Sequence, residues 1–539
     1  MGKTQKTRKS FILRLVVYAA ITGVLVGATI AVFMTAARIV ISFVFGAHKA
    51  ADTPLAVVCL IMLSIMCCFA MAVLQTLCPA AKGSGIPLAE GYARGMLGAK
   101  WLSSAAGLAA GSLLAFLGGL PLGSEGPSIG IGGMLGDGIG RLTKRPAPFR
   151  RYLITGGASA GLATAFNAPL TGIAFAVEET HRRFSPDILL SALTAVTAAV
   201  VTAQAIFYGF GQIAYLRALD IHMGFAVLPY LEQAKLSGVW LFKIFGAALA
   251  CGVVSALVAV GFNRAIGATS QLLSRIGSPL LRLLPAFVLT AICGAGLYLT
   301  VGSGEAMLAE IKLDTELWLL IVLLVLRIAL TVTASGAGAT GGLFLPMIAI
   351  GGLLGTLAAR LCVLCGMPEQ YAPNIIMTCI AAFFAASVRA PISAIALSVE
   401  LTASFTNLLP CAAAVAAAMA VADLTRTDPL YERMMNELRK AAHKAKRNIA
   451  RVTVAGVIKR GSIVCGKQLR NVLWPYNALI VSLTRNNDTI VPDGETKLRD
   501  GDEITVCAEN VDPDVFRAEL REFIFIPETI QTNEVRRNL

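Results

Sequence analysis

Apolar runs long enough to cross a lipid bilayer recur from about Phe11 to Asp423, and they constrain the fold of this chain more than any other feature. A mean hydropathy of +0.72 with only 14% charged residues excludes an ordinary soluble globule. Glycine or proline interrupts many of the runs, which favours a transporter or channel over a set of simple anchors. The sequence therefore predicts an all-α, polytopic membrane protein embedded in the lipid bilayer.

Basic residues gather at the two ends of the apolar region and contribute to a net charge of +14. They are Lys3, Lys6, Arg8, Lys9 and Arg14 before the first run, and Arg433, Arg439, Lys440, Lys444, Lys446, Arg447 and Arg451 after the last. Under the positive-inside rule both termini lie in the cytosol, so the chain crosses the membrane an even number of times. The charge does not indicate a nucleic-acid partner, because no soluble basic domain with interleaved aromatic residues is present.

One carboxylate, Glu125, lies among glycines in the middle of long apolar sequence, in Gly123-Ser124-Glu125-Gly126-Pro127. Because an ionised side chain at membrane depth is costly, it faces a cavity or a pathway by default. Pro127 suits the first turn of a helix, and the glycines leave backbone amides exposed. We expect a helix to begin at Gly126 to Pro127, with its positive dipole end beside Glu125. This pattern predicts an anion-binding site in which the Glu125 carboxylate competes with the bound anion.

Two further glycine-rich segments lead into a proline. In Gly83-Ser84-Gly85-Ile86-Pro87, the Ser84 hydroxyl stands just ahead of a helix start, where it either caps that helix or faces a bound anion. The segment from Ser335 to Pro346 has no competing carboxylate nearby. Its amides are therefore predicted to be the better place for a bound anion.

The sequence contains an internal repeat. A shift of 219 residues aligns Pro127 with Pro346, and a shift of 222 aligns Pro169 with Pro391. The same shifts match Ile129 with Ile348, Gly132 with Gly351, Gly136 with Gly355, Arg141 with Arg360, and Val177-Glu178 with Val399-Glu400. Repeats with Gly- and Pro-interrupted segments at corresponding positions are typical of transporters whose site lies where the halves meet. We expect two inverted halves with broken, re-entrant helices.

The composition changes beyond the last apolar run. Short apolar strands at Val452–Ile458, Leu479–Leu483, Thr489–Val491 and Ile504–Cys507 are separated by turn signals and followed by a helix at Asp512–Phe523, which predicts a small α/β cytosolic domain. The expected division is a tail at 1–10, a membrane domain at 11–431, a basic linker at 432–451, this domain at 452–525 and a tail at 526–539. Within the membrane domain, the polar stretch from Gln212 to Lys235 is expected to be an extended loop.

The three glycine-rich motifs resemble, in order, those of the CLC family of chloride channels and proton-coupled chloride transporters. Gly83, Gly85 and Pro87 match the family's GSGIP, while Gly123, Gly126 and Pro127 match its G(K/R)EGP, and Gly342 and Pro346 match its GxFxP. Pro429-Leu430-Tyr431 resembles the segment that carries the pore tyrosine. The resemblance implies that Ser84, Tyr431 and the amides of Leu343 and Phe344 bind a central chloride, with Glu125 as the gate. It also implies a homodimer.

Two other positions refine what the resemblance implies. Glu179 matches the glutamate that passes protons inward in the proton-coupled branch, although pairing with Arg182 or Arg183 at a membrane boundary is an alternative role. Ser84 indicates chloride rather than nitrate or fluoride. Ser124, in contrast, stands where the family usually has Lys or Arg, and the loss of that cation weakens the local positive potential.

The C-terminal region resembles the TrkA C-terminal module of bacterial transport systems, on Gly461-Ser462, Gly466-Lys467, Pro492-Asp493-Gly494 and Asp500-Gly501-Asp502. This resemblance implies a regulatory or dimerising domain with an unidentified ligand or none. Together with the lack of targeting signals, it indicates a bacterial inner (plasma) membrane.

The leading hypothesis is chloride/proton exchange, with protons and chloride sharing Glu125. A passive chloride channel of the same fold is the main alternative, and a fluoride exporter is disfavoured by Ser84. A cation transporter would need carboxylates or carbonyls at the site, whereas the repeat supplies helix N-termini. An enzyme is rejected, because the sequence has no HExxH motif and no histidine that lies centrally in an apolar run beside a Ser or Cys nucleophile. No cofactor or metal site is predicted.

Overall fold

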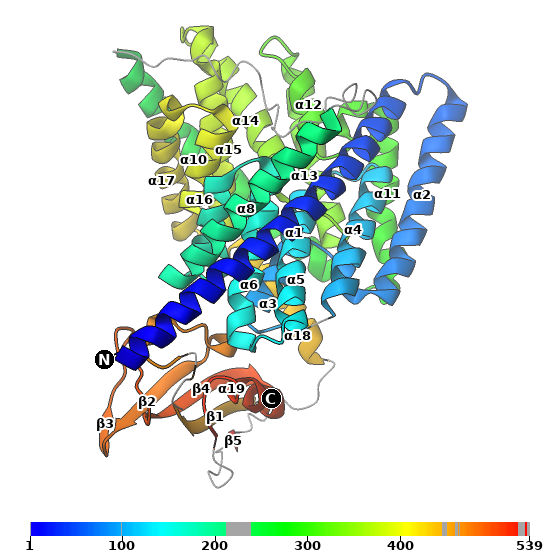
Figure 1. Ribbon diagram of the computed structural model, residues 1–539. Helices are drawn as coiled ribbons and strands as arrows, with labels where there is room; N and C mark the ends of the chain where they lie inside the picture. The colour runs from blue at the N-terminus through cyan, green and yellow to red at the C-terminus, as the bar shows by residue number, and fades with distance from the viewer. Residues whose placement is uncertain are drawn as a thin grey trace.

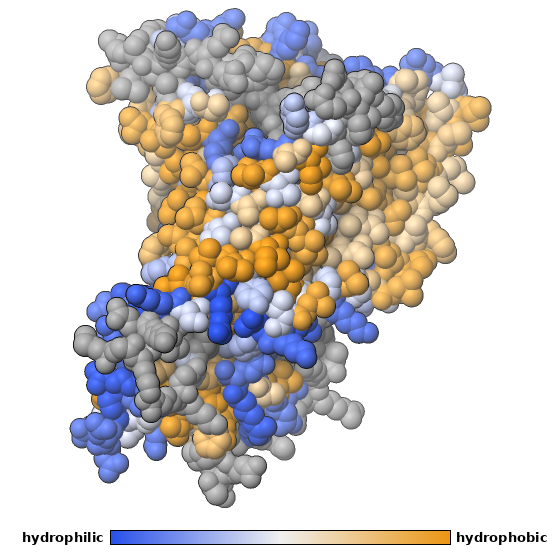
Figure 2. All heavy atoms as spheres, viewed as in Figure 1, coloured by the Kyte–Doolittle hydropathy of each residue, from blue (hydrophilic) through white to orange (hydrophobic). Residues whose placement is uncertain are grey.

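The computed structural model has a large helical body and a small sheet-containing domain beneath it (Figure 1). It describes residues 2–98, 100–211, 239–444, 450–458, 462, 464–526 and 534–535. The expected loop at Gln212–Lys235 and most of the tail at 526–539 lie outside the described residues. The space-filling view shows a broad apolar band around the helical body, with hydrophilic residues above and below it (Figure 2).

Long apolar helices account for that band. Among the described residues, eight helices are long and apolar enough to cross a membrane, and side chains such as Met62, Phe69 and Val201 face outward from them. Outward-facing apolar side chains suit contact with lipid tails. The predicted polytopic all-α membrane body is therefore confirmed.

The helices of the first half run from the N-terminus to residue 211. They are α1 (Gly2–Lys49), α2 (Pro54–Leu77), α3 (Gly85–Ala93), α4 (Trp101–Leu117), α5 (Glu125–Leu142), α6 (Ala147–Phe166), α7 (Pro169–Phe175) with its π-helical continuation η2 (Ala176–Thr180), and α8 (Pro186–Gly211). Short helices such as α3 and α7 cannot span a bilayer at 1.5 Å per residue, so the chain breaks inside the membrane body as predicted.

The second half begins at residue 239. Its helices are α10 (Val239–Leu273), α11 (Pro279–Gly296), α12 (Glu305–Glu310), α13 (Leu317–Gly336), α14 (Phe344–Leu364), α15 (Ala372–Val388), α16 (Pro391–Thr402), α17 (Leu408–Leu424) and α18 (Leu430–Lys444). The repeat pairs α5 with α14 and α7 with α16.

Equivalent glycines of the two halves allow close helix packing. A Cβ atom on Gly132 of α5 would lie 2.2 Å from the Gly157 carbonyl oxygen of α6. Its repeat counterpart, Gly351 of α14, would place a Cβ 2.8 Å from the Cα of Ile380 in α15. Small residues at such crossings are the usual means of packing helices in membranes, where lipid is as apolar as leucine.

Two reciprocal helix caps show that the halves are inverted. Glu178, at the end of α7 and η2, accepts hydrogen bonds from the N–H groups of Ile392 (2.9 Å) and Ser393 (2.7 Å) at the start of α16. Its repeat counterpart Glu400, late in α16, accepts from the N–H groups of Leu170 (2.6 Å) and Thr171 (2.9 Å) at the start of α7. Such reciprocal contacts are the mark of two-fold symmetry, and the two helices run antiparallel. The expected inversion of the repeat is confirmed.

The C-terminal domain is built on an antiparallel sheet of order β3-β2-β4-β1-β5. Its strands are β1 (Ala450–Val457), β2 (Leu479–Arg485), β3 (Asp488–Ile490), β4 (Glu503–Val511) and β5 (Glu534–Val535), and helix α19 (Pro513–Leu520) packs against it. Asp512 caps α19, as its carboxylate accepts from the N–H groups of Asp514 and Val515. The predicted small α/β domain is confirmed.

The beginning of α1 and the C-terminal domain lie on the same side of the helical body (Figure 1). The ammonium of Lys467, from the C-terminal domain, lies 4.0 Å from the ring centroid of Phe11 in α1. A cation over an aromatic face is attracted by the ring quadrupole. The two ends of the membrane region therefore share one face of the protein.

Candidate functional site

The glycine-rich loops of the two halves meet at the centre of the membrane body. Gly123 and Gly342, which the repeat makes equivalent, form an isolated antiparallel bridge. The Gly123 N–H donates to the Gly342 carbonyl at 2.8 Å, and the Gly342 N–H donates to the Gly123 carbonyl at 2.7 Å. This bridge brings the N-terminal ends of α5 and α14 together, so the free amides of both helices serve one region.

Glu125 is the first residue of α5, slightly earlier than the predicted start at Gly126 to Pro127. Its side chain is 1% exposed. Oε1 accepts a hydrogen bond from the Ser124 hydroxyl at 3.2 Å, while Oε2 has no hydrogen-bond partner among the described residues. The carboxylate lies at the start of α5, near Leu345 in the first turn of α14. The carboxylate thus occupies a place suited to an anion.

The expectation that the third motif has no competing carboxylate nearby is wrong. A Cβ atom on Gly123 would lie 2.2 Å from Oε2 of Glu125 and 3.0 Å from the Cβ of Leu345. Glu125 therefore lies against the first turn of α14 as well as that of α5. The sequence separates these segments by more than 200 residues, whereas the bridge between Gly123 and Gly342 joins them.

Ser84 takes the first of the two roles that the sequence left open, and its position leaves the second available. It is the N-cap of α3, with its hydroxyl oxygen accepting from the Ile86 N–H at 3.4 Å. The same oxygen would lie 2.7 Å from a Cβ atom on Gly126, and Gly342 is equally close to that point. Because the hydroxyl oxygen accepts in the cap bond, its hydrogen remains available to donate to a bound anion.

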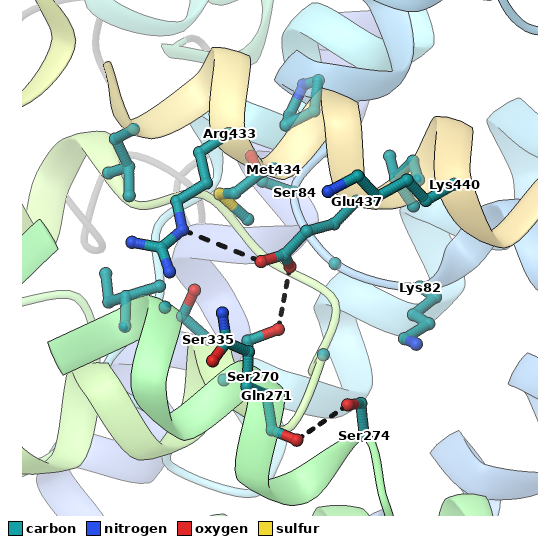
Figure 3. Close-up of a pocket in the computed structure, with 18 of the residues that line it drawn as sticks. Lys82, Ser84, Ser270, Gln271, Ser274, Ser335, Arg433, Met434, Glu437 and Lys440 are labelled. Atoms are coloured by element: carbon teal, nitrogen blue, oxygen red, sulfur yellow. Dashed lines mark hydrogen bonds and ion pairs between the residues drawn. The ribbon is translucent and has the colours of Figure 1, made fainter. Parts of the chain in front are cut away.

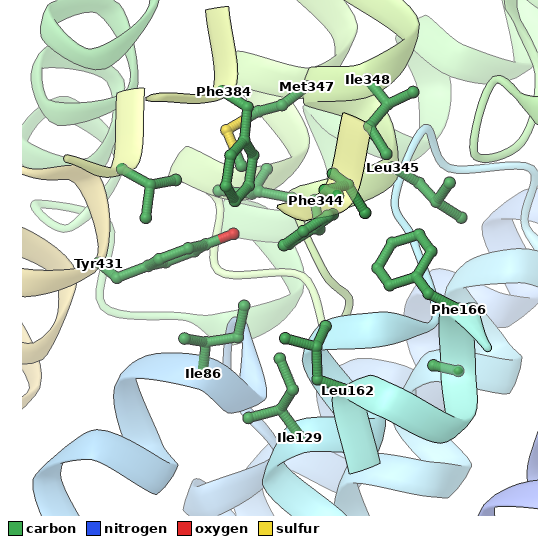
Figure 4. Packing of buried hydrophobic residues seen from close by; sticks show 14 of the residues in the cluster. Ile86, Ile129, Leu162, Phe166, Phe344, Leu345, Met347, Ile348, Phe384 and Tyr431 are labelled. Atoms are coloured by element: carbon green, nitrogen blue, oxygen red, sulfur yellow. The ribbon is translucent and has the colours of Figure 1, made fainter. Parts of the chain in front are cut away.

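The predicted amides of Leu343 and Phe344 lie at the start of α14, and both residues are buried. The Phe344 ring packs against Phe384, with ring centroids 4.4 Å apart, and against Phe166, at 4.7 Å. Figure 4 shows the Tyr431 hydroxyl pointing toward Phe344 within this cluster. Since that hydroxyl is buried without a hydrogen-bond partner among the described residues, it is free to donate to an anion.

The remaining motif residues shape the backbone around these groups. Gly83 has a left-handed φ of 80°, and a Cβ on Gly85 would lie 2.3 Å from the Gly126 carbonyl oxygen. Pro87, Pro127 and Pro346 each lie near the beginning of a helix, where a missing N–H costs no intrahelical bond.

Glu179 lies apart from the central group, in the π-helical turn η2 at the end of α7. The alternative was that it pairs with Arg182 or Arg183; among the described residues, Arg182 forms an ion pair with Glu432, and no hydrogen bond from either arginine reaches the Glu179 carboxylate. Both carboxylate oxygens of Glu179 are buried without a hydrogen-bond partner among the described residues. A buried acid with unused oxygens is suited to carrying a proton.

A cavity of about 390 Å³ opens beside Ser84 (Figure 3). Four cationic side chains line it: Lys82, Arg282, Arg433 and Lys440. Glu437 is the acidic lining residue; it accepts from the Ser270 hydroxyl at 2.9 Å and lies 3.8 Å from Arg433. A cleft dominated by one sign of charge concentrates ions of the other sign. The cavity therefore favours the approach of anions to Ser84.

Neutralising Glu437 is expected to speed anion entry. Glu437→Gln keeps an oxygen that can accept from Ser270, but it removes the negative charge that faces the incoming anion. We expect chloride flux at low ionic strength to rise about twofold, with the gain shrinking as salt screens the cavity. Chloride efflux from proteoliposomes measures this, with Glu369→Gln, an exposed carboxylate outside the cavity, as the matched control. An unchanged or lower flux would contradict the electrostatic role of the cavity.

The sequence analysis missed Glu437, Glu90 and Arg94. Glu90 and Arg94 are four residues apart on α3 and are 2% and 6% exposed. Their spacing on one helix face within apolar sequence was an available signal of an internal charged pair. Glu437 gave no such signal, since it lies in a basic, polar helix.

Comparisons with known proteins agree with this arrangement. A family profile described as "Voltage gated chloride channel" matches residues 66–423, and one described as "TrkA-C domain" matches residues 455–520. The chain is 32% identical over 387 residues to the H(+)/Cl(-) exchange transporter ClcA of Yersinia pestis bv. Antiqua (strain Angola), covering 70% of this chain and 76% of the relative. It is 29% identical over 366 residues to the ClcA of Vibrio parahaemolyticus serotype O3:K6, covering 66% and 75%.

Solved structures share the fold. A slow cyanobacterial Cl-/H+ antiporter superposes with a TM-score of 0.69 at 28% identity, covering 79% of this chain and 98% of that one. A CLC-type fluoride/proton antiporter superposes with a TM-score of 0.60 at 20% identity, covering 78% and 97%, which supports the fold alone. The family consists of membrane transport proteins, so the chain is a transporter and not an enzyme. The chain belongs to the voltage-gated chloride channel (CLC) family, and it carries a TrkA-C domain at its C-terminal end.

Proposed function

We propose that this protein exchanges chloride for protons across a bacterial inner membrane, with Glu125 as the group that both ions share. One observation carries the proposal: the buried Glu125 carboxylate lies where the starts of α5 and α14 meet. The Ser84 hydroxyl lies close to Gly126 and Gly342 at the same junction, and the Tyr431 hydroxyl points toward Phe344 at the start of α14 (Figure 4). When ionised, the Glu125 carboxylate competes with chloride for that place. When protonated, it no longer does, so the site is open to chloride.

Chloride is proposed to enter from the cationic cavity and to bind between Ser84, Tyr431 and the amides of Leu343 and Phe344. Charge-assisted hydrogen bonds from N–H and O–H groups are the usual way to hold a desolvated anion. Glu179 is proposed to pass protons between the cytosol and Glu125 by a route separate from the cavity. The names of the ClcA relatives and of the cyanobacterial antiporter support exchange.

We further infer that the face carrying the start of α1 and the C-terminal domain is cytosolic, as the flanking basic residues predict. The division into a membrane domain at 11–431, a linker at 432–451 and a regulatory domain at 452–525 belongs to the same proposal. A homodimer, which the family resemblance implies, would contain one pathway in each subunit. The molecular mass of the detergent-solubilised protein measures the number of subunits.

Proton uptake by chloride-loaded proteoliposomes tests the proposed exchange. The vesicles are diluted into low chloride without a pH gradient, and valinomycin with potassium sets the voltage. Chloride leaving through an exchanger drives protons inward against their own gradient, so the interior is expected to acidify. Chloride efflux without proton movement would establish a passive channel instead, the alternative that Ser124 favours by replacing a cation.

A further inference from the structure

The C-terminal domain is anchored directly to the helical body by charged groups that are buried or partly buried. The Arg151 guanidinium of α6 donates to the Leu473 carbonyl at 2.6 Å and to the Glu519 carboxylate at 2.6 Å. The Lys467 ammonium donates to the Asp187 carboxylate of α8 at 2.8 Å. Burial alone lowers the pKa of Lys467, but Tyr152 and Asp187 raise it more, so its pKa stays above its ordinary value and the ammonium is charged at neutral pH. These contacts hold the domain in a defined position.

One further contact reaches Arg94 on α3. The Tyr476 N–H of the C-terminal domain donates to the Arg94 carbonyl at 3.1 Å. Tyr476 and the following Asn477 both have left-handed backbone conformations, with φ of 56° and 52°. Residues other than glycine rarely adopt this backbone conformation, and it persists where surrounding contacts require it. The turn that presents the Tyr476 N–H is therefore specifically shaped by its surroundings.

The Arg94 side chain extends from this contact to the segment that carries Glu179. Its Nε donates to the Thr180 carbonyl at 2.7 Å, and its Nη2 donates to the Glu179 carbonyl at 2.8 Å. These carbonyls end the π-helical turn η2, where a helix has no internal donor for them. Glu90, one turn earlier on α3, lies 3.7 Å from the same guanidinium. Arg94 thus joins the C-terminal domain to the backbone of Glu179.

The Glu179 carboxylate has no such support of its own. Both of its oxygens are buried without a hydrogen-bond partner among the described residues. Its side-chain position consequently depends on where the backbone of η2 is held, and the Arg94 guanidinium holds two successive carbonyls there. A π-helical turn of this kind is frequent at functional sites, where it redirects a side chain.

We propose that Arg94 is a positioning residue for Glu179, and that the docked C-terminal domain keeps Arg94 in place through Tyr476. Loosening the domain then slows proton delivery through Glu179 more than it slows chloride movement, because the anion cavity and the bridge between Gly123 and Gly342 are separate from these contacts. This inference rests on the proposed function, in which Glu179 carries protons. It gives the TrkA-C domain a defined way to alter the ratio of protons to chloride.

A purely structural role for Arg94 predicts a different result. If the guanidinium only capped a helix, its loss would reduce the amount of folded protein, and the proton and chloride rates would fall together. The ratio of the two rates, measured on equal amounts of reconstituted full-length protein, separates the two roles.

The experiment compares the initial proton and chloride rates of full-length variants in proteoliposomes. Arg94→Ala is expected to lower the proton-to-chloride ratio at least about tenfold, since small displacements of a reacting group have effects of this size. Arg94→Lys is expected to restore part of the ratio, because an ammonium can reach one carbonyl but cannot make the paired contact of a guanidinium. A docking variant, Lys467→Ala with Glu519→Gln, is expected to lower the ratio in the same direction while every membrane helix remains unaltered.

Arg470→Ala is the matched control for the docking variant. Arg470 belongs to the same domain, and its ion pair with Glu495 lies within that domain at 3.1 Å. The proton-to-chloride ratio of the Arg470→Ala variant is expected to equal that of the unmodified protein. If the Arg94 and docking variants lower both rates in proportion, or leave the ratio unchanged, the inference is overturned.

Glu179→Gln separates this inference from the proposed function. If Glu179→Gln abolishes proton movement while the Arg94 and docking variants keep the normal ratio, the proton role of Glu179 stands and only the coupling to the C-terminal domain fails. If Glu179→Gln leaves proton movement intact, the role of Glu179 in the proposed function fails, and this inference fails with it.

Discussion

Glu125→Gln is expected to abolish proton transport while chloride continues to move. Glutamine has the same shape, and its amide oxygen can still accept from the Ser124 hydroxyl, but it neither carries a proton nor competes with chloride as an anion. We expect the proton flux to fall by at least about a hundredfold, the range that loss of a positioned proton-transfer group costs. Chloride-driven proton uptake and chloride efflux, recorded from the same proteoliposomes, measure the two fluxes.

Glu305→Gln is the matched control for this prediction. Glu305 is a carboxylate in the first turn of α12, outside the glycine-rich loops that carry the proposed site. We expect this variant to retain coupled exchange. Proton movement that persists in Glu125→Gln would remove Glu125 from the proton route, and equal loss in both variants would show that the position of the carboxylate is not what matters.

Gly126→Ala is expected to have the second-largest effect, an at least tenfold loss of chloride transport. The added Cβ would lie 2.6 Å from the Cα of Gly342 and 2.7 Å from the Ser84 hydroxyl oxygen. Because one neighbour is backbone, the two loops would have to separate, and a displacement of about 1 Å at a binding site can cost a hundredfold in rate. Overpacking a tight site also destabilises a protein by about 1–3 kcal/mol. Chloride efflux at matched reconstituted amounts measures the first effect.

Gly261→Ala, in α10, provides the comparison for this substitution. An added Cβ there meets no atom within 4 Å, and the residue is exposed on its helix. Both helix propensity and space favour alanine at that position, so we expect normal transport. Thermal unfolding in detergent shows whether Gly126→Ala loses function without losing its fold. Normal chloride transport in Gly126→Ala would mean that the convergence of Ser84, Gly126 and Gly342 is not the anion site.

The two proposed routes differ in the charges around them. The cavity beside Ser84 carries four cations and leads to backbone amides, as an anion route requires. The segment around Glu179 contains carboxylates and an arginine that donates to carbonyl groups. The C-terminal domain contacts the second region through Arg94, so regulation by that domain is expected to act on protons first.

Much of the candidate site could be predicted from sequence because its chemistry is local. Glycine before proline marks a helix start with free amides, and a carboxylate in such a place indicates function whatever the rest of the chain does. Glu125, Ser84 and the motif prolines were found in this way. Leu343, Phe344 and Tyr431 required the family resemblance, since nothing in an apolar helix start or in a lone tyrosine identifies an anion ligand.

Other features depend on contacts between distant segments. The spacing of Glu90 and Arg94 signals a charged pair, but only the hydrogen bonds of Arg94 to residues 85 and 86 positions later relate it to Glu179. Glu178 and Glu400 were matched by the repeat, yet nothing in the repeat indicates that each caps the helix of the opposite half. The error over the third motif has the same origin, because proximity to Glu125 was judged along the chain.

The amino-acid sequence by itself determined that this is a membrane transporter with two repeated halves, helix starts that present amides, and a separate C-terminal domain. Hydropathy, glycine and proline act within a few residues, so these properties can be read locally. The tertiary structure alone decided that Gly123 pairs with Gly342, that Glu125 therefore faces both helix ends, and that Tyr476 reaches Arg94. Such contacts form when the inverted halves and the docked domain pack together. They are made by backbone N–H and C=O groups, which nearly every residue has, so the residue types do not reveal them.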